Sequence, residues 1–479
     1  MGYYKVNQVF LRGLKAMRLA IVWVLSVFVG VSSTEVMAKA SSGIFQYQLN
    51  NGMKVVVKPD HRAPVAVQQL WYRVGSNYEE NGLTGISHML EHMMFKGTKT
   101  LKPGEFSKRV AKMGGQENAF TSSDYTVYYQ VIGKKHLADV MKLEADRMRN
   151  LVITQKAFQK ERQVVAEERR WRIEDQPSSK LYEQFNAVAF MNSPPHHPTI
   201  GWMTDIQHYK VEDVRRWYRK WYAPNNATLV VVGDVEPQQV LKLAKRYYGV
   251  YQSEKIVQPK PQQEIPQQGE RQVYFKGATK VPSVLMGFHV PTLVTAKTPE
   301  EKQDVYALSV LSNVLDGDDA SRLTKDLIRG SKQLASAGAG YDQLSRLETL
   351  FLMEGTPSKG VTPKQVEDAL WQEIEKLQNT LIQPEELNRV LVQTEAQSVY
   401  HQDSIQAQAM MLGASISVGL PTDTEAHWIE HLRTVTPQQV QAVAKKYFSK
   451  DKMTLGVLLP NGKAPVQPVS SAMAAGGIR

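Results

Sequence analysis

The stretch "VEDVRRWYRKWYAPNNATLVVVGDV", residues 211–235, decides the fold because its plan occurs twice in the chain. Residues 437–460, "PQQVQAVAKKYFSKDKMTLGVLLP", show the same order: an amphipathic helix ending in aromatic residues, a polar turn and a β-rich run. Tyr222 aligns with Phe448 and Thr228 with Thr454, both at an offset of 226 residues. A repeat of this length indicates a duplicated domain rather than a solenoid.

The domain boundaries follow from the same repeat. Near the start of each copy, "APVAVQQLWYRVGS" from Ala63 resembles "VPSVLMGFHVPT" from Val281. Between the copies, residues 252–271 are rich in Pro and Gln and lack an apolar period, which is typical of a linker. We therefore predict an N-terminal domain at 41–251, a linker at 252–271, a C-terminal domain at 272–460 and an unstructured tail at 461–479.

Strands and helices alternate irregularly within each copy. Residues 53–60, 66–75 and 125–133 have the pattern of strands, and residues 137–151 and 157–171 have the apolar spacing of helices. We predict an α+β fold made of two duplicated α/β sandwich domains. Each would have a mainly antiparallel sheet with helices packed on one face.

The first 40 residues have the features of an export signal. Basic residues precede the apolar run 19–31, and "AKA" at 38–40 has the form of a cleavage site. We predict a signal peptide at 1–40 and a periplasmic protein, with translation starting at Met1 or Met17. The alternative is an uncleaved membrane anchor, although the apolar run is short for a membrane span.

Composition excludes several classes of protein. The chain has 479 residues, of which 42% are hydrophobic and 22% charged, so it is globular and long enough for two domains. It contains no cysteine, which excludes disulfides and cysteine-ligated zinc. The formal net charge is +11, but no basic run with interleaved aromatic residues occurs, and we predict no binding to nucleic acid.

The motif "HMLEH" at 88–92 carries the first sign of chemistry. On a helix, His88, Glu91 and His92 would share one face. Two imidazoles one turn apart can chelate a divalent ion, and a carboxylate beside them can accept a proton from an activated water. The alternative is a helix with two core histidines and a glutamate present by chance.

A helix at 158–171 offers a further ligand. Glu161 and Glu168 share its apolar stripe with Phe158 and Val165, whereas Glu167 points elsewhere. Burying two carboxylates is costly unless a cation or hydrogen bonds compensate, and a metal would compensate. The alternative is a solvated acidic helix.

Through these two motifs the chain resembles the pitrilysin family of zinc metallopeptidases, which includes insulysin and the mitochondrial processing peptidase. "HMLEH" is that family's inverted zinc motif, and "ERQVVAEE" at 161–168 matches its downstream pattern. The resemblance implies one zinc per chain, held by His88, His92 and Glu168. It also implies that Glu91 is the general base on a zinc-bound water and that Glu161 supports the site from behind.

The resemblance also implies how substrate binds. Residues 114–129, "GGQENAFTSSDYTVYY", are similar to the family's glycine turn and edge strand. Asn118, Ala119, Phe120 and Thr121 would then pair with the backbone of an extended peptide. The alternative is an ordinary hairpin, since Gly and Asn are common in turns. His196 and His197 lie in a proline-rich segment and are interpreted as loop residues.

The second copy lacks the zinc motif and departs from the family in one respect. Arg329 stands where the family has a substrate-contacting arginine, but Ser336 stands where a tyrosine is expected, and Tyr341 is out of register. We therefore expect a zinc endopeptidase for peptides or unfolded segments that works with a similar, zinc-less subunit in a heterodimer. A homodimer is the alternative arrangement, and a non-catalytic or partner-dependent binding subunit is the alternative function.

Overall fold

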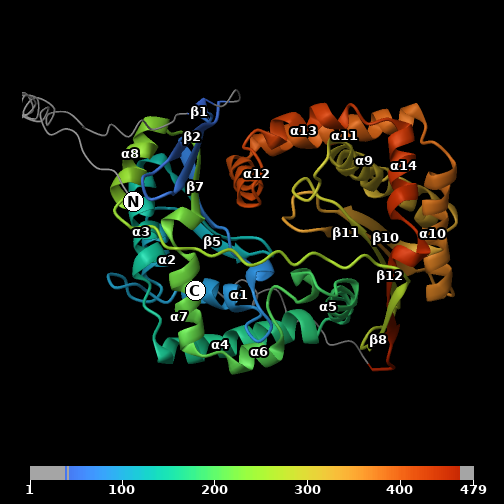
Figure 1. Cartoon of the computed structure of the whole chain (residues 1–479), viewed down its shortest axis with the longest axis horizontal. Coiled ribbons are helices and arrows are strands. Elements are labelled where there is room, and N and C mark those ends of the chain that lie inside the picture. Colours follow the sequence, from blue (N-terminus) through green and yellow to red (C-terminus); the bar gives the residue numbers. More distant parts are fainter. Residues whose placement is uncertain (1–37, 40–42, 464–479) are drawn as a thin grey trace, which may run out of the picture. The chain divides into compact units, whose positions relative to one another are not determined.

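The computed structural model describes the backbone of residues 38–39 and residues 43–463 (Figure 1). Most of the predicted signal peptide and most of the predicted tail therefore lie outside the described residues. Strand β1, Ala38–Lys39, would be removed by signal cleavage after Ala40. In the described part of the chain, no helix is both long and apolar enough to cross a membrane.

The N-terminal half contains a seven-stranded sheet in the order β1-β2-β3-β7-β4-β6-β5. β3 and β7 run parallel, and the other neighbouring pairs are antiparallel. The strands that follow β1 are β2 Phe45–Gln48, β3 Lys54–Pro59, β4 Val65–Tyr72, β5 Gln116–Thr121, β6 Thr126–Gly133 and β7 Ala227–Gly233. The predicted strands at 53–60, 66–75 and 125–133 correspond to β3, β4 and β6.

The C-terminal half contains a five-stranded sheet in the order β10-β11-β9-β12-β8. Its strands are β8 Arg271–Gly277, β9 Ser283–Val290, β10 Leu334–Tyr341, β11 Thr349–Pro357 and β12 Met453–Pro460. This order repeats β5-β6-β4-β7-β3, including the parallel pair at the end. The duplication predicted from sequence is therefore present in the topology, with β7 and β12 in equivalent central places.

The two halves differ in their α-helices among the described residues, with eight in the first and six in the second. The N-terminal half has α1 Ile86–Met93, α2 Glu105–Lys112, α3 Leu137–Asn150, α4 Gln155–Arg169, α5 Pro177–Ala189, α6 Met203–His208, α7 Val211–Trp221 and α8 Pro237–Tyr247. The C-terminal half has α9 Pro299–Asp316, α10 Pro363–Asn379, α11 Pro384–Asp403, α12 Ile405–Ser417, α13 Thr424–Leu432 and α14 Pro437–Tyr447. Residues 252–270 form neither helix nor strand, as expected of a linker, although the predicted domain boundaries stay predictions.

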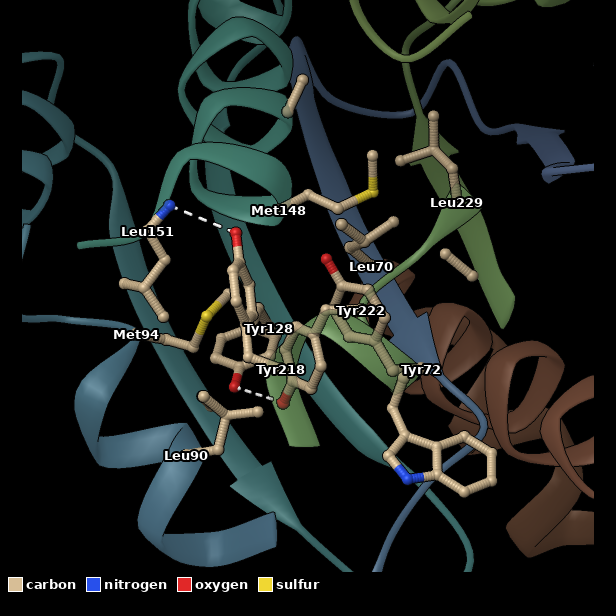
Figure 2. Close-up of a cluster of buried hydrophobic side chains, with 14 of the residues drawn as sticks. Leu70, Tyr72, Leu90, Met94, Tyr128, Met148, Leu151, Tyr218, Tyr222 and Leu229 are labelled. Carbon is tan, nitrogen blue, oxygen red and sulfur yellow. Dashed lines mark hydrogen bonds between the residues drawn. The ribbon is translucent and has the colours of Figure 1, made fainter. Parts of the chain in front are cut away.

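An aromatic cluster at the centre of the N-terminal core fixes α1 against the sheet. Tyr72 stacks on Tyr222, with ring centroids 4.1 Å apart, and the hydroxyls of Tyr128 and Tyr222 are 2.8 Å apart (Figure 2). Leu90 and Met94, from α1 and its C-terminal cap, reach into the same cluster. The bond between Tyr128 and Tyr222 gives this core a specific packing, whereas the buried Tyr72 hydroxyl has no hydrogen-bond partner among the described residues.

One helix from each half covers the second face of the other half's sheet. α12 packs on β4 and β7, where a Cβ at Gly413 would lie 1.9 Å from the Trp71 indole. α5 packs on β8 and β12, and Phe185 of α5 lies against Gly287 and Gly456. The fold class is as predicted, but the sequence did not indicate this exchange of helices. It ties the two halves together through two apolar contacts.

Candidate metal centre and active site

α1 begins directly after a close crossing of two backbone segments. Gly85 has a φ of +82°, and a Cβ there would lie 2.2 Å from the Ile200 carbonyl oxygen. Gly201 has a φ of +86°, and a Cβ there would lie 2.1 Å from the Thr84 oxygen. Only glycine fits at either position. This crossing sets where α1, with its histidines, enters the core.

A buried carboxylate holds the N-terminus of α1. Glu79 accepts hydrogen bonds from the backbone N–H groups of Gly85 at 2.6 Å and Ser87 at 2.8 Å. Burial raises the pKa of Glu79 to about 7, even though these N–H groups lower it. The Tyr209 hydroxyl donates to the Thr84 carbonyl in the same segment. The two bonds to Glu79 occupy N–H donors that a helix start leaves unpaired.

His88, His92 and Glu168 converge as predicted. Their ligand atoms all lie within 4.8 Å of one another, and no other such group occurs among the described residues. Nε2 of His92 is 3.1 Å and Nε2 of His88 is 3.7 Å from the same Glu168 oxygen, Oε2. Ligands about 2.0–2.1 Å from a tetrahedral zinc would be about 3.3 Å apart. The donor set and its spacing therefore fit a zinc ion.

The charges around the group favour a cation at its centre. Burial lowers the pKa of His92, but its hydrogen bonds to Glu161 and Glu168 outweigh burial and raise that pKa to about 9. Burial raises the pKa of Glu168, but the hydrogen bond from His92 and the charge of His88 lower it to about 2. Each carboxylate also has one basic neighbour, Lys96 for Glu161 and Arg172 for Glu168, yet the raised pKa of His92 indicates that the centre of the group still favours positive charge. A divalent ion would supply it.

Glu161 lies behind His92, on the side away from Glu168. Its Oε1 is 3.0 Å from Nδ1 of His92, and its Oε2 is 2.8 Å from Nζ of Lys96. This bond fixes which nitrogen of His92 faces Glu168. Glu167 instead forms an exposed ion pair with Arg170. The helix-face argument and the structure thus agree that Glu168 faces the metal group and that Glu167 faces solvent.

Glu91 lies outside the ligand group and is buried beside it. Its Oε2 accepts a hydrogen bond of 2.6 Å from the Thr121 hydroxyl. Burial raises the pKa of the Glu91 carboxyl, and the bond from Thr121 opposes this. A carboxylate with a raised pKa, next to a metal group but not part of it, suits proton transfer.

β5 places the predicted substrate-binding residues at the edge of the sheet. It pairs only with β6 among the described strands, so no other described strand lies along its second side. Thr121, which holds Glu91, ends this strand. Phe120 meets Trp71 edge to face at 6.4 Å, and the Asn118 side chain accepts from the Ala119 N–H. The edge strand thus ends beside the metal-binding group.

A cavity of about 940 Å³ opens from the site toward the C-terminal half. His88 and Thr121 line it on one side and Tyr341 on the other. His197 also lines it and is only 5% exposed, so this loop residue contributes to the wall. A larger hollow of about 1110 Å³ on the outer side of α4 includes Glu161 but none of the three ligands.

Two arginines near the site were missed by sequence reasoning. α4 continues into a π-helical segment, 170–174, a feature that is common at functional sites. There Nε of Arg172 is 3.0 Å from the second oxygen of Glu168. Arg169 is buried and pairs with Glu183 of α5 at 2.7 Å. The four-residue spacing of Glu168 and Arg172 was the available signal.

The remaining predicted residues lie apart from the metal group. Arg329 is exposed, pairs with Asp319 at 3.1 Å and does not line the cavity. Ser336 lies on β10. Tyr341, which ends β10, lines the cavity while its hydroxyl donates to the Pro291 carbonyl. A role for Arg329 in substrate binding therefore stays a prediction.

The C-terminal half has a hollow at the equivalent place. Ser309, Ser312 and Asn313 have the spacing of His88, Glu91 and His92 and line a cavity of about 340 Å³. Gln397 lines it too and, like Glu168, lies 13 residues after the first residue of its helix. Val390 takes the position in α11 that Glu161 has in α4. The architecture is repeated without the metal ligands.

Comparison with known proteins identifies the family. Residues 54–201 match "Insulinase (Peptidase family M16)", and residues 208–393 match "Peptidase M16 inactive domain". The chain is 34% identical over 360 residues to "Zinc protease PqqE" of Helicobacter pylori, covering 74% of this chain and 79% of that one. It is 25% identical to "Uncharacterized zinc protease YmxG" of Bacillus subtilis, covering 88% of this chain and 100% of that one.

Solved structures of other proteins have the same fold. A crystal structure of a protease from Helicobacter pylori has a TM-score of 0.82 at 30% identity, covering 87% of this chain and 99% of that chain. The periplasmic protease PqqL from Escherichia coli has the same fold, with a TM-score of 0.72 at 18% identity. That match covers 92% of this chain but 51% of PqqL, so the present chain corresponds to about half of that protein.

Proposed function

Because the chain belongs to peptidase family M16, we propose that it is an exported zinc endopeptidase that hydrolyses peptides or unfolded segments. The observation that carries the proposal is the convergence of His88, His92 and Glu168 with Glu91 buried beside them. Relatives named as zinc proteases support the metal and the reaction class. The proposal goes further in assigning one ion to each chain and a role to each residue.

In the proposed mechanism, a bound zinc would polarise the scissile carbonyl and lower the pKa of water. Glu91 accepts a proton from the attacking water and passes it to the leaving nitrogen. Thr121 holds the Glu91 carboxylate by its 2.6 Å hydrogen bond. Glu161 orients His92, and Arg172 occupies the second oxygen of Glu168. These contacts restrict Glu91, His92 and Glu168 to one geometry, which proton transfer requires.

The substrate would bind as an added strand along β5. The free edge of β5 offers backbone donors and acceptors to an extended peptide, which gives affinity with little dependence on sequence. Thr121 at the end of β5 would bring the scissile bond next to Glu91. Folded proteins, whose backbone is already paired, would be excluded.

The active form is proposed to contain a second subunit. The chain covers about half of PqqL, and its C-terminal half has Ser336 where the family has a tyrosine. A zinc-less subunit with the Arg/Tyr pair would complete the site in a heterodimer, with a homodimer as the alternative. The periplasmic location named for PqqL supports export, and an uncleaved signal would instead anchor the protein in the membrane.

Metal analysis and peptide digestion test the proposal together. We expect one zinc per purified chain, digestion of unstructured peptides that a chelator abolishes, and recovery when zinc is returned. Activity should be low alone and rise when a similar zinc-less chain is co-expressed. Zinc-loaded protein that digests no peptide, either alone or with the co-expressed chain, would instead favour a non-catalytic binding subunit. The match of residues 208–393 to an inactive domain is consistent with that alternative.

A further inference from the structure

The loop 342–348, between β10 and β11 of the C-terminal half, contacts the N-terminal half at the turn between β5 and β6. The Arg346 backbone N–H donates to Oδ2 of Asp124 at 2.8 Å, and Nε of the same arginine lies 3.3 Å from Oδ1. Asp124 is only 2% exposed. Because an unpaired carboxylate is costly to bury, Asp124 needs a cationic partner, and Arg346 provides it from the other half of the chain.

The guanidinium of Arg346 also binds the segment that precedes α1. Its Nη2 donates to the Asn77 carbonyl at 3.2 Å, and its central carbon lies 4.4 Å from the centre of the Tyr78 ring. The Asn77 side-chain amide in turn donates to Oδ1 of Asp124 at 2.8 Å. We call this set, Arg346 with Asn77, Tyr78 and Asp124, the inter-half clamp. It joins the turn after β5 to the segment before α1.

Each side of the inter-half clamp is next to a group that holds the candidate active site. On one side, Thr121 ends β5 three residues before Asp124, and its hydroxyl donates to Glu91. On the other side, Glu79 directly follows Tyr78 and accepts from backbone N–H groups at the start of α1. The clamp therefore lies between the hydrogen-bond partner of Glu91 and the helix that carries Glu91.

The two sides are also bonded directly to each other. The Ser76 N–H donates to the Ser122 carbonyl at 3.2 Å, and the Asn77 N–H donates to the Ser123 carbonyl at 2.8 Å. A Cβ at Gly75 would lie 2.2 Å from the Ser122 oxygen, so the two segments are in close contact. A displacement of the turn after β5 would therefore also move the segment before α1.

We propose that Arg346 is a positioning residue for the proposed hydrolysis. Through the inter-half clamp it fixes Thr121 and the start of α1, and thereby the Glu91 carboxylate. This inference rests on the proposed function for the role of Glu91. It gives the C-terminal half, whose described part holds no second ligand group, a part in the reaction. A misplacement of about 1 Å can cost about 100-fold in rate, so a small movement of Glu91 is measurable.

The first test compares Arg346→Ala with Arg389→Ala in peptide hydrolysis, with each chain assayed alone and with the co-expressed zinc-less chain. Arg389 is a matched control because it pairs with Asp318 within the C-terminal half, and its side chain is 27% exposed, compared with 29% for Arg346. Arg346→Ala should lower kcat about 10-fold to 100-fold, change KM less and keep its zinc. Arg389→Ala should keep the kcat of the unsubstituted chain.

A conservative variant separates positioning from folding. Arg346→Lys keeps a charge for Asp124 but lacks the planar fork that also reaches the Asn77 carbonyl. Its kcat should lie between those of Arg346→Ala and the unsubstituted chain, and it serves for the same comparison if Arg346→Ala does not fold.

Hydrogen exchange of the same variants tests the clamp independently of activity. Arg346→Ala should raise deuterium uptake in residues 74–80 and 119–126, and Arg389→Ala should not. Unchanged uptake in these segments, or an Arg346→Ala chain that keeps its kcat or loses activity only because it loses zinc, would overturn the inference alone. If the unsubstituted chain hydrolyses no peptide in either preparation, the proposed function is overturned, and the exchange data still decide whether Arg346 fixes the two segments.

Discussion

The helix pair α1/α4 and the helix pair α9/α11 occupy the same places in two copies of one fold, yet only the first can hold a metal. His88, His92 and Glu168 are matched in the second copy by Ser309, Asn313 and Gln397, and a cavity of about 340 Å³ is lined by all three replacements. The fold therefore does not depend on the ligands. In the proposed function, the chemistry depends on a few side chains placed on a repeated frame.

The largest difference between the pairs should appear when one residue is removed from each. His92→Ala should lower zinc affinity more than about 100-fold, since even the loss of a residue that only supports a ligand can cost that much. Asn313→Ala, at the matching position of α9, should leave zinc content unchanged. Metal content after dialysis measures both, and stoichiometric zinc in His92→Ala would show that the ligand set is wrong.

The comparison can also be tested by transplanting the ligands. Ser309→His/Asn313→His/Gln397→Glu should raise the zinc content from one to two ions per chain, because it restores two imidazoles one turn apart and a facing carboxylate. The single variant Ser309→His should still bind one zinc ion per chain. A folded triple variant that binds a single zinc would mean that α9 and α11 are not spaced as α1 and α4 are.

The exchanged helices should contribute similarly to both halves. Phe185→Ala in α5 should lower the free energy of unfolding by about 3–5 kcal/mol, because a fully buried ring is lost. Leu412→Ala in α12 should cost about 2–5 kcal/mol for the same reason. Tyr182→Ala, at a 47% exposed position of α5, should change little. Denaturant unfolding distinguishes these cases, and a small effect at Phe185 would indicate that α5 is not needed by the C-terminal sheet.

A loss of similar size is expected at the crossing before α1. Gly85→Ala should cost about 1–2 kcal/mol for the left-handed backbone and about 1–3 kcal/mol more for the contact with Ile200. Gly114 has a φ of +73°, and a Cβ there would meet no atom within 4 Å. Gly114→Ala should therefore show only the cost of the left-handed backbone. Denaturant unfolding of both variants gives the comparison. Equal losses in the two variants would remove the steric part of the explanation.

How far the sequence predicts this molecule depends on the range of each interaction. Helical spacing was enough to place Glu168 rather than Glu167 at the metal group, because it is a property of one helix. The burial of His197 and the exchange of α5 and α12 depend on contacts between segments far apart in the chain, for which periodicity gives no signal. Arg329 was assigned by resemblance alone, and the structure leaves it in an exposed ion pair.

The most direct test of the central claim is a paired measurement of zinc content and peptide hydrolysis on Glu91→Gln. Glu91 lies outside the group of His88, His92 and Glu168, and the substitution keeps an oxygen that can accept the Thr121 hydrogen bond. The account predicts one zinc per chain, as in the unsubstituted protein, with hydrolysis reduced by at least about 100-fold. Hydrolysis at the unsubstituted rate would contradict the role of Glu91 as the base, and loss of zinc would show that Glu91 belongs to the ligand set.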